Sequence, residues 1–374
     1  MKTSIKFIIT ISFLFVLLPL SNELIASSKT EKLDQFFNEK LATGEFNGNV
    51  LIALKGKIFY HKSFGIASID PKKPLHLESQ FKLASVSKQF TAMAIMILQE
   101  RGKLKYDDNI KLYLPELPYD NITIRHLLTH TSGLPDYMEL FSYNLDIMGR
   151  SVIRENRKIA DNVDVINMLV KSKSRGLFLP GEKFQYSNTG YALLATIVSR
   201  ISKQPFEAFL KKNIFEPLNM SDSLIYSAIR SDQMKHRVNG LSVYRTLENE
   251  LRYAIKDFHY FDGIAGDHGM YSTTTDLFKW DRALYTAKLV SQLTIKEAFQ
   301  PVILNDKSTY DYGFGWSIGR SKIGRQWVAH GGGWLGFRTF IVRYIEHDNT
   351  IILLVNISKE QQSFLQNIAD IIND

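Results

Sequence analysis

The stretch FKLASVSKQFTAMAIMILQERG, residues 81–102, places a serine and a lysine where a helix is predicted to begin. Residues 89–102 contain no proline, and their only glycine is the last residue. They are rich in Ala, Met, Leu and Gln, which favour helices, and Gly102 is a stop signal. The sequence therefore predicts a helix whose first turn carries Ser85 and, three residues later on the same face, Lys88.

This placement suits nucleophilic catalysis. Backbone N–H groups at the start of a helix would stabilise an oxyanion beside Ser85, and Lys88 could accept its proton. The spacing alone is weak evidence, because Ser79 and Lys82 repeat it in a segment with strand-like alternation. A strand would put these two on opposite faces. On spacing alone, an N-cap serine followed by a surface lysine remains the alternative for Ser85 and Lys88.

The composition indicates a globular protein with one large domain or two closely joined ones. The chain has 374 residues, 45% of them hydrophobic, and a formal net charge of +8. Its basic residues alternate with acidic ones and form no basic and aromatic run, so we expect no nucleic-acid partner. The absence of cysteine excludes a disulfide scaffold, a thiol nucleophile, a thiolate metal site and a lipid-modified cysteine.

Residues 1–28 have the pattern of a signal for export. Lys2 and Lys6 precede a mostly apolar stretch, residues 7–20, and small residues follow at 26–28. The apolar stretch is short for a membrane span, so we expect cleavage, with an uncleaved anchor as the alternative. The mature chain would be residues 29–374, located in the periplasm or cell envelope without a stable membrane span.

The two ends of the chain are rich in strands and its middle is helical. The periodicity predicts helices at 30–41, 122–130, 163–170, 191–201, 206–214 and 359–372, and strands at 49–53, 58–63, 326–329, 338–344 and 351–357. These elements predict an α+β fold: one antiparallel sheet built from both ends, flanked by the terminal helices. Its α/β part would be residues 29–105 and 274–374, and the inserted helical part residues 106–273, with a site at their junction.

Two further motifs accompany the serine and lysine. Tyr186-Ser187-Asn188 ends a loop before an apolar helix, and His330-Gly331-Gly332-Gly333 follows the predicted strand 326–329. A run of glycines lets a substrate or another backbone approach a strand closely. Each motif is weak by itself, but their order along the chain is specific.

Together these motifs resemble those of the serine β-lactamase and penicillin-binding protein superfamily, in its class C-like branch. That branch includes DD-peptidases, D-aminopeptidases and esterases. Residues 126–135 (HLLTHTSGLP), 269–273 (GMYST) and 312–316 (YGFGW) extend the resemblance over essentially the whole mature chain. The resemblance implies the β-lactamase/transpeptidase-like fold and a serine hydrolase that works without a cofactor or a metal.

The resemblance also implies a role for each motif residue. Ser85 would be the acylated nucleophile and Lys88 its base or hydrogen-bonding partner. Tyr186 would move protons between Ser85 and the leaving group, so the base remains undecided between Lys88 and Tyr186. Asn188 would bridge Lys88 and the acyl side chain of the substrate. His330 would stand where many relatives carry the lysine of a Lys-Thr-Gly motif.

The backbone N–H groups of Ser85 and Gly333 would form the oxyanion hole, with Gly331 and Gly332 lining the substrate. Relatives with Lys-Thr-Gly use its cation and hydroxyl to hold a substrate carboxylate. An ordinary histidine is mostly neutral at pH 7 and Gly331 has no hydroxyl, so the sequence disfavours β-lactams and carboxypeptidase substrates. The pattern is more similar to that of the D-aminopeptidase and esterase members.

Two other residue pairs are weaker candidates. His126 and His130 have a spacing that can hold zinc, but no third ligand is evident, so we expect packing or capping roles. Asp267 and His268 could serve a Ser-His-Asp triad, although their place in a family loop favours a structural role.

The sequence thus predicts an exported serine hydrolase that acts on an ester or a D-amino-acid-containing amide. The alternatives are a penicillin-binding or β-lactam-sensing envelope protein that acylates with little turnover, or a true class C-like β-lactamase. We expect a small-molecule or cell-wall-derived substrate and a monomer.

Overall fold

The computed structural model describes residues 17–141, 159–172, 175–226, 234–320, 324–359 and 362–373. Most of the predicted export signal, residues 1–16, lies outside this set. Within the set, no helix is both long and apolar enough to cross a membrane. The predicted boundaries after residues 28, 105 and 273 stay predictions.

A six-stranded antiparallel sheet joins the two ends of the chain, as predicted. Its strand order is β12-β13-β14-β15-β1-β2. The strands are β1 (Gly48–Leu54), β2 (Lys57–Phe64), β12 (Ser317–Arg320), β13 (Gln326–Trp334), β14 (Phe337–Tyr344) and β15 (Asn349–Val355). N-terminal β1 pairs with C-terminal β15 along its length, which confirms the predicted α+β architecture.

Strand β13 is longer than predicted, because the glycine run does not follow the strand but belongs to it. Gly331, Gly332 and Gly333 pair with residues 338–340 of β14. Strand β12 pairs only with residues 326–329 of β13, so the glycine run extends beyond the end of β12.

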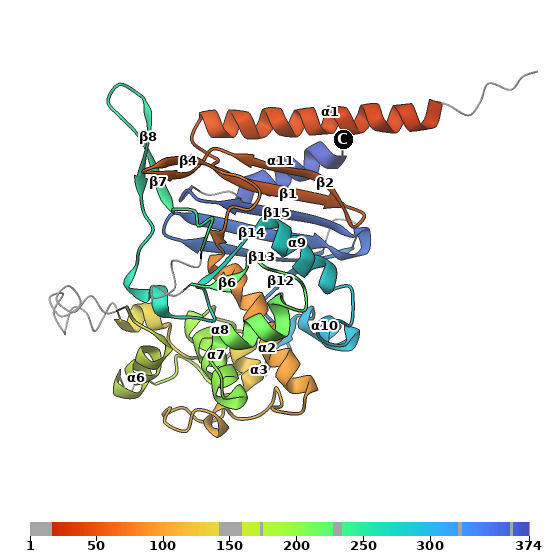
Figure 1. Cartoon of the computed structure of the whole chain (residues 1–374). Coiled ribbons are helices and arrows are strands. Elements are labelled where there is room, and N and C mark those ends of the chain that lie inside the picture. The colour runs from red at the N-terminus through yellow and green to blue at the C-terminus, as the bar shows by residue number, and fades with distance from the viewer. Residues whose placement is uncertain are drawn as a thin grey trace, which may run out of the picture.

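The terminal helices cover one face of the sheet. Helices α1 (Leu17–Ala42) and α11 (Gln362–Asn373) lie together on that side, as Figure 1 shows. Buried Phe37 of α1 and Phe364 of α11 share an apolar cluster with Val50 of β1. Burial of large apolar side chains is what holds these helices to the sheet.

The opposite face carries α9 (Thr274–Ala283) and, beyond it, the helical part of the molecule (Figure 1). The helices there are α2 (Lys88–Glu100), α3 (Ile124–Leu128), α6 (Asn162–Ser172), α7 (Asn188–Ser202), α8 (Phe206–Leu210), followed by a π-helical turn at Lys211–Phe215, and α10 (Gln292–Ala298). The Trp280 ring of α9 packs 4.3 Å from the Phe90 ring of α2, and the Trp280 indole donates to Gln89 Oε1. The sheet and the helical part therefore share one core.

Several short strands were not predicted. A hairpin of β7 (Leu241–Arg245) and β8 (Leu251–Ile255), and the strands β9 (Met270–Ser272) and β6 (Leu224–Ile225), lie within the range predicted as mainly helical. Strand β5 (Phe81–Lys82), which pairs with β9, falls in the segment with strand-like alternation and was expected. The others are β3 (Ile66–Ile69), β4 (Lys72–Pro74), β10 (Val302–Ile303) and β11 (Thr309–Tyr310). Strands of two to five residues give too little alternation to be recognised in a sequence.

A buried carboxylate connects α9 to the middle of the sheet. Asp281 accepts hydrogen bonds from Arg343 Nε of β14 at 2.5 Å and from Thr350 Oγ1 of β15 at 2.9 Å. Its other oxygen accepts from Arg282 Nε at 2.9 Å. Asp281, Arg343 and Thr350 are almost completely inaccessible to solvent.

We predict that Asp281→Ala lowers the free energy of unfolding by about 3–5 kcal/mol, because it leaves the buried Arg343 charge unpaired. Urea denaturation measures the change. The control is Asp120→Ala, which removes an exposed partner of Lys111 and should cost about 1 kcal/mol or less. Equal effects of the two substitutions would show that the buried contact does not stabilise the fold.

Candidate active site

Ser85 lies in a tight turn that joins β5 to α2. The turn is a 3₁₀ helix, Ala84–Ser87, which runs directly into α2 at Lys88. Ala84 has a φ of +49°, a left-handed conformation that costs a non-glycine residue about 1–2 kcal/mol. This reversal turns the chain between strand and helix, and it confirms the prediction that Ser85 begins a helical segment.

Lys88 is the centre of the site. Its buried ammonium donates to Ser85 Oγ at 3.1 Å, to Asn188 Oδ1 at 2.9 Å and to the backbone oxygen of Asp267 at 3.0 Å. An ammonium has three hydrogens and no lone pair, so these three acceptors use its full capacity. The structure thus brings together the predicted serine, lysine and asparagine, which are up to 103 residues apart in the sequence. Only a neutral amine at Lys88 could accept the serine proton.

Asp136, which the sequence analysis missed, orients Asn188. One carboxylate oxygen of Asp136 accepts from both the backbone N–H of Asn188 at 2.7 Å and its side-chain amide at 3.1 Å. The amide oxygen of Asn188 is thereby turned toward Lys88. Burial raises the pKa of Asp136 above its usual value, which backbone hydrogen bonds and the Lys88 charge partly offset. Its position directly after the matched segment 126–135 was the signal that could have found it.

Asp267 and His268 support Lys88 from the protein interior. The Asp267 carboxylate accepts from the Tyr137 hydroxyl at 2.8 Å and contacts His268 Nδ1 at 2.9 Å. His268 Nε2 lies 3.1 Å from the backbone oxygen of Phe261. Burial would raise the pKa of Asp267, but His268 and Lys88 together hold it below its usual value. Both ring nitrogens of His268 contact groups other than Ser85. Asp267 and His268 therefore have a structural role and do not form a catalytic triad with Ser85.

Tyr186 and Ser85 line the same cavity. The Lys88 ammonium lies 4.9 Å from the centre of the Tyr186 ring, and the His130 ring packs 4.2 Å from it. Tyr186 is 39% exposed, so its ring has one side on the protein and one side on the cavity. The structure therefore places Tyr186 next to the predicted serine–lysine pair.

His330 lines this cavity but is 95% inaccessible and held by neighbours on both nitrogens. Nδ1 donates to the backbone oxygen of Gly331 at 2.7 Å, so Nε2 accepts from the Tyr312 hydroxyl at 2.9 Å. Burial, with the nearby Lys88 charge, lowers the pKa of His330 to about 3. The ring is neutral at pH 7, and this motif presents no cation to a substrate.

The cavity at Ser85 has a volume of about 790 Å³. The described residues that line it are Ser85, Phe184, Tyr186, Thr309, Tyr310, Asp311, Tyr312, Ser317, His330 and Gly331. Phe184 and Tyr310 stack at 3.7 Å between ring centres on its wall. Sequence reasoning missed these residues because Phe184 lies in a loop and residues 309–310 form the two-residue strand β11, and neither segment has a recognisable periodicity.

The glycine run of β13 packs against the turn Ala84–Ser87, the serine turn. A Cβ placed on Gly332 would lie 2.3 Å from the backbone oxygen of Leu83 and 3.0 Å from the backbone nitrogen of Ser85. Only glycine fits at such a distance. Gly333, the predicted second oxyanion donor, is the next residue of the strand.

The other sequence candidates have different partners. Lys82 forms a buried ion pair with Asp262, and Ser79 Oγ accepts from the backbone of His76, so the second serine–lysine match is no catalytic pair. His126 Nδ1 caps the start of α3, and buried His130 accepts from the backbone of Ser187. These capping and packing contacts agree with the roles expected for both histidines.

Among the described residues, one group has the geometry for a metal. Ligand atoms of His76, Glu78 and His236 lie within 4.8 Å of one another near the surface. None of the three lines the cavity at Ser85.

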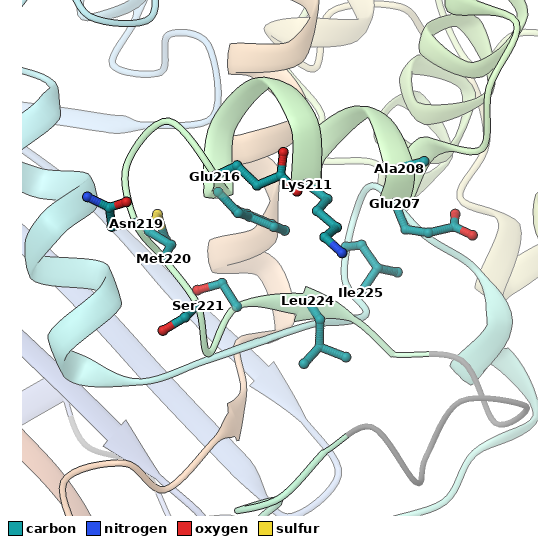
Figure 2. Close-up of a pocket in the computed structure, with 11 residues that line it drawn as sticks. Glu207, Ala208, Lys211, Glu216, Asn219, Met220, Ser221, Leu224 and Ile225 are labelled. Carbon is teal, nitrogen blue, oxygen red and sulfur yellow. The ribbon is translucent and has the colours of Figure 1, made fainter.

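A second hollow, about 740 Å³ in volume, lies between α8 with its π-helical turn and β6 (Figure 2). Glu207, Lys211, Glu216 and Leu224 are among its lining residues. It contains none of the predicted site residues.

Comparisons with known proteins match almost the whole chain. A family model described as Beta-lactamase matches residues 33–372. Penicillin-binding protein 4* of Bacillus subtilis (strain 168) is 41% identical over 338 residues, which cover 88% of this chain and 72% of that protein.

Solved structures have the same fold. The octameric penicillin-binding protein homologue from Pyrococcus abyssi has a TM-score of 0.76 at 27% identity, covering 92% of this chain and 77% of that one. A D-stereospecific amidohydrolase from Streptomyces sp. has a TM-score of 0.69 at 20% identity, covering 91% and 97%.

We predict that Lys88→Arg slows acylation of Ser85 by about a hundredfold or more, because arginine keeps the charge but cannot accept a proton. The rate of labelling by a fluorophosphonate measures this step. Lys103→Arg, an exchange on the surface, is the control and should label at the wild-type rate. Wild-type labelling of Lys88→Arg would remove Lys88 from the base role and leave Tyr186.

The low pKa of His330 predicts how stability changes with pH. Unfolded histidine takes up a proton near pH 6.5, whereas folded His330 does so only at about pH 3. The contribution of neutral His330 to the free energy of unfolding is therefore complete above pH 6.5 and is lost as the pH falls toward 3. Between pH 7 and 4.5 the wild type should lose about 2 kcal/mol more than His330→Gln in urea denaturation. Parallel losses in the two proteins would contradict a buried neutral histidine.

Proposed function

The chain belongs to the beta-lactamase family, and we propose that it is an exported serine hydrolase that forms an acyl-enzyme on Ser85. Its substrate would be an ester or an amide containing a D-amino acid. The observation that carries the proposal is the hydrogen bonding of one buried lysine to both Ser85 and Asn188 at the edge of a cavity.

In acylation, Ser85 Oγ would attack the carbonyl carbon of the substrate while its proton passes to neutral Lys88 or through Tyr186. The backbone N–H groups of Ser85 and Gly333 would hold the oxyanion of the tetrahedral intermediate. Tyr186, on the cavity side, would return the proton to the leaving oxygen or nitrogen as the bond to the carbonyl carbon breaks. Water would then attack the acyl-enzyme and release the acid and free Ser85.

The motif at His330 and Gly331 favours substrates whose leaving group carries no charge. His330 is neutral and buried against Tyr312, and Gly331 has no hydroxyl. A carboxylate on the leaving group would find neither the cation nor the hydroxyl of a Lys-Thr-Gly motif. Each lost charge-assisted hydrogen bond would cost about 1.5–3 kcal/mol.

Two alternatives remain within the family. A penicillin-binding or β-lactam-sensing protein would acylate with little turnover, which the 41% identity to a penicillin-binding protein supports. A true class C-like β-lactamase would turn over β-lactams. In each case we expect residues 29–374 to act in the periplasm or envelope as a monomer, on a small molecule or a fragment of the cell wall.

We predict a higher kcat/KM on short-chain aryl esters than on nitrocefin or on peptides that end in D-Ala-D-Ala. Ser85→Ala should abolish hydrolysis and labelling by fluorophosphonate, whereas Ser79→Ala, the matched control, should retain both. A single burst of product without turnover would favour the penicillin-binding alternative. Hydrolysis of nitrocefin with kcat/KM of about 10⁵ M⁻¹s⁻¹ or more would refute the preference for esters.

A further inference from the structure

Two histidines and a glutamate from distant parts of the chain meet outside the cavity at Ser85. Ligand atoms of His76, Glu78 and His236 all lie within 4.8 Å of one another. His236 stands 160 positions after His76, and the two rings lie edge to face with 4.6 Å between their centres. The contact from His236 Nε2 to Glu78 Oε2 is 3.5 Å long, which is longer than an ordinary hydrogen bond.

Buried neighbours fix the backbone of both histidines. The backbone N–H of His76 donates to Ser79 Oγ at 3.0 Å, and its carbonyl accepts from the Asn49 amide at 2.8 Å. The backbone N–H of His236 donates to Gln80 Oε1 at 3.2 Å, and its carbonyl accepts from the Gln80 N–H at 2.8 Å. Asn49, Ser79 and Gln80 are buried. The fold therefore sets the positions from which the two imidazoles project.

The three side chains have room to adjust. The side chain of His236 is 36% exposed and that of Glu78 is 71% exposed, and His76 is exposed as well. Zn²⁺ binds imidazole nitrogen and carboxylate oxygen tetrahedrally at about 2.0–2.2 Å, which separates its ligand atoms by about 3.4 Å. The contact of His236 with Glu78 already has that separation. Rotation of exposed side chains needs to shorten the other separations by at most about 1.4 Å.

The donor set identifies the class of ion. Neutral imidazole is the commonest metal ligand in proteins, and two histidines with one carboxylate are a ligand set of zinc. Mg²⁺ and Ca²⁺ prefer oxygen ligands, so a site with two nitrogens does not suit them. Arg237, the residue after His236, pairs with Asp257 at 2.8 Å rather than with Glu78. The group therefore fits a divalent transition metal, with water completing its coordination.

We propose that His76, Glu78 and His236 bind a divalent transition-metal ion, with Zn²⁺ as the representative. The ion would join two segments that already pair with each other, since the N–H of Val238 donates to the carbonyl of Gln80 at 3.0 Å. Strand β5 begins at the next residue. The ion would act through the fold rather than in the proposed chemistry, because none of its ligands lines the cavity of the active site. The inference goes beyond the proposed hydrolase function and does not depend on it.

The test is calorimetric titration of the full chain with ZnCl₂, after treatment with EDTA, dialysis and removal of any polyhistidine tag. The wild type should bind one Zn²⁺ per chain. Loss of one protein ligand in His76→Ala, Glu78→Gln or His236→Ala should weaken Kd about tenfold or more. Zn²⁺ in excess should also raise the Tm of the wild type, because the ligands come together only in the folded chain. This rise should be smaller in the three variants.

Two control variants leave the group intact. His347→Ala removes an exposed histidine outside it, and Ser85→Ala removes the proposed nucleophile. Both should bind Zn²⁺ as the wild type does. Because the ligands are exposed or partly exposed, their variants should unfold near the wild-type Tm when no metal is present. Melting curves without metal therefore check that the variants are folded.

Two results would overturn the inference. One is the absence of saturable Zn²⁺ binding by the wild type. The other is equal affinity in the wild type and His236→Ala, since the ion would then be an adventitious one held elsewhere on the surface. Failure of the proposed function has a separate signature: Zn²⁺ binding that needs His236, without any hydrolysis that depends on Ser85, would refute the hydrolase and support the metal site.

Discussion

The ammonium of Lys88 is the contact on which the site depends. It binds the turn that carries Ser85, the start of α7 through Asn188, and the segment before β9 through the backbone of Asp267. A buried charge is tolerated only when its hydrogens are bonded and opposite charge is near. Asp136 and the Asp267 carboxylate meet this need without touching the ammonium, so Lys88 remains directed at Ser85.

The sheet supplies the second constraint, because β13 has to reach the serine turn. Thr339 Oγ1 of β14 donates to the backbone oxygen of Leu83 at 2.6 Å, directly before the turn. Gly332 lies on the same side and leaves no room for a side chain. The position of Ser85 therefore depends on residues more than 240 positions away, and the strained φ of Ala84 is maintained by this packing.

Local signals in the sequence were sufficient for the long elements and the three motifs. The helix after Ser85, the terminal strands and the neutral state of His330 were predicted because composition, periodicity and residue type determine them. Asp136 was missed although it directly follows the motif segment 126–135. Phe184 was missed because its place on the cavity wall depends on stacking against Tyr310, a contact that leaves no local pattern.

The charge state of His330 bears on substrate choice. Relatives with a Lys-Thr-Gly motif offer their cation to a substrate carboxylate, whereas His330 here is neutral and buried. Strand β13 thus brings a neutral imidazole to the cavity at Ser85, and its glycine run leaves room for the turn that carries the serine.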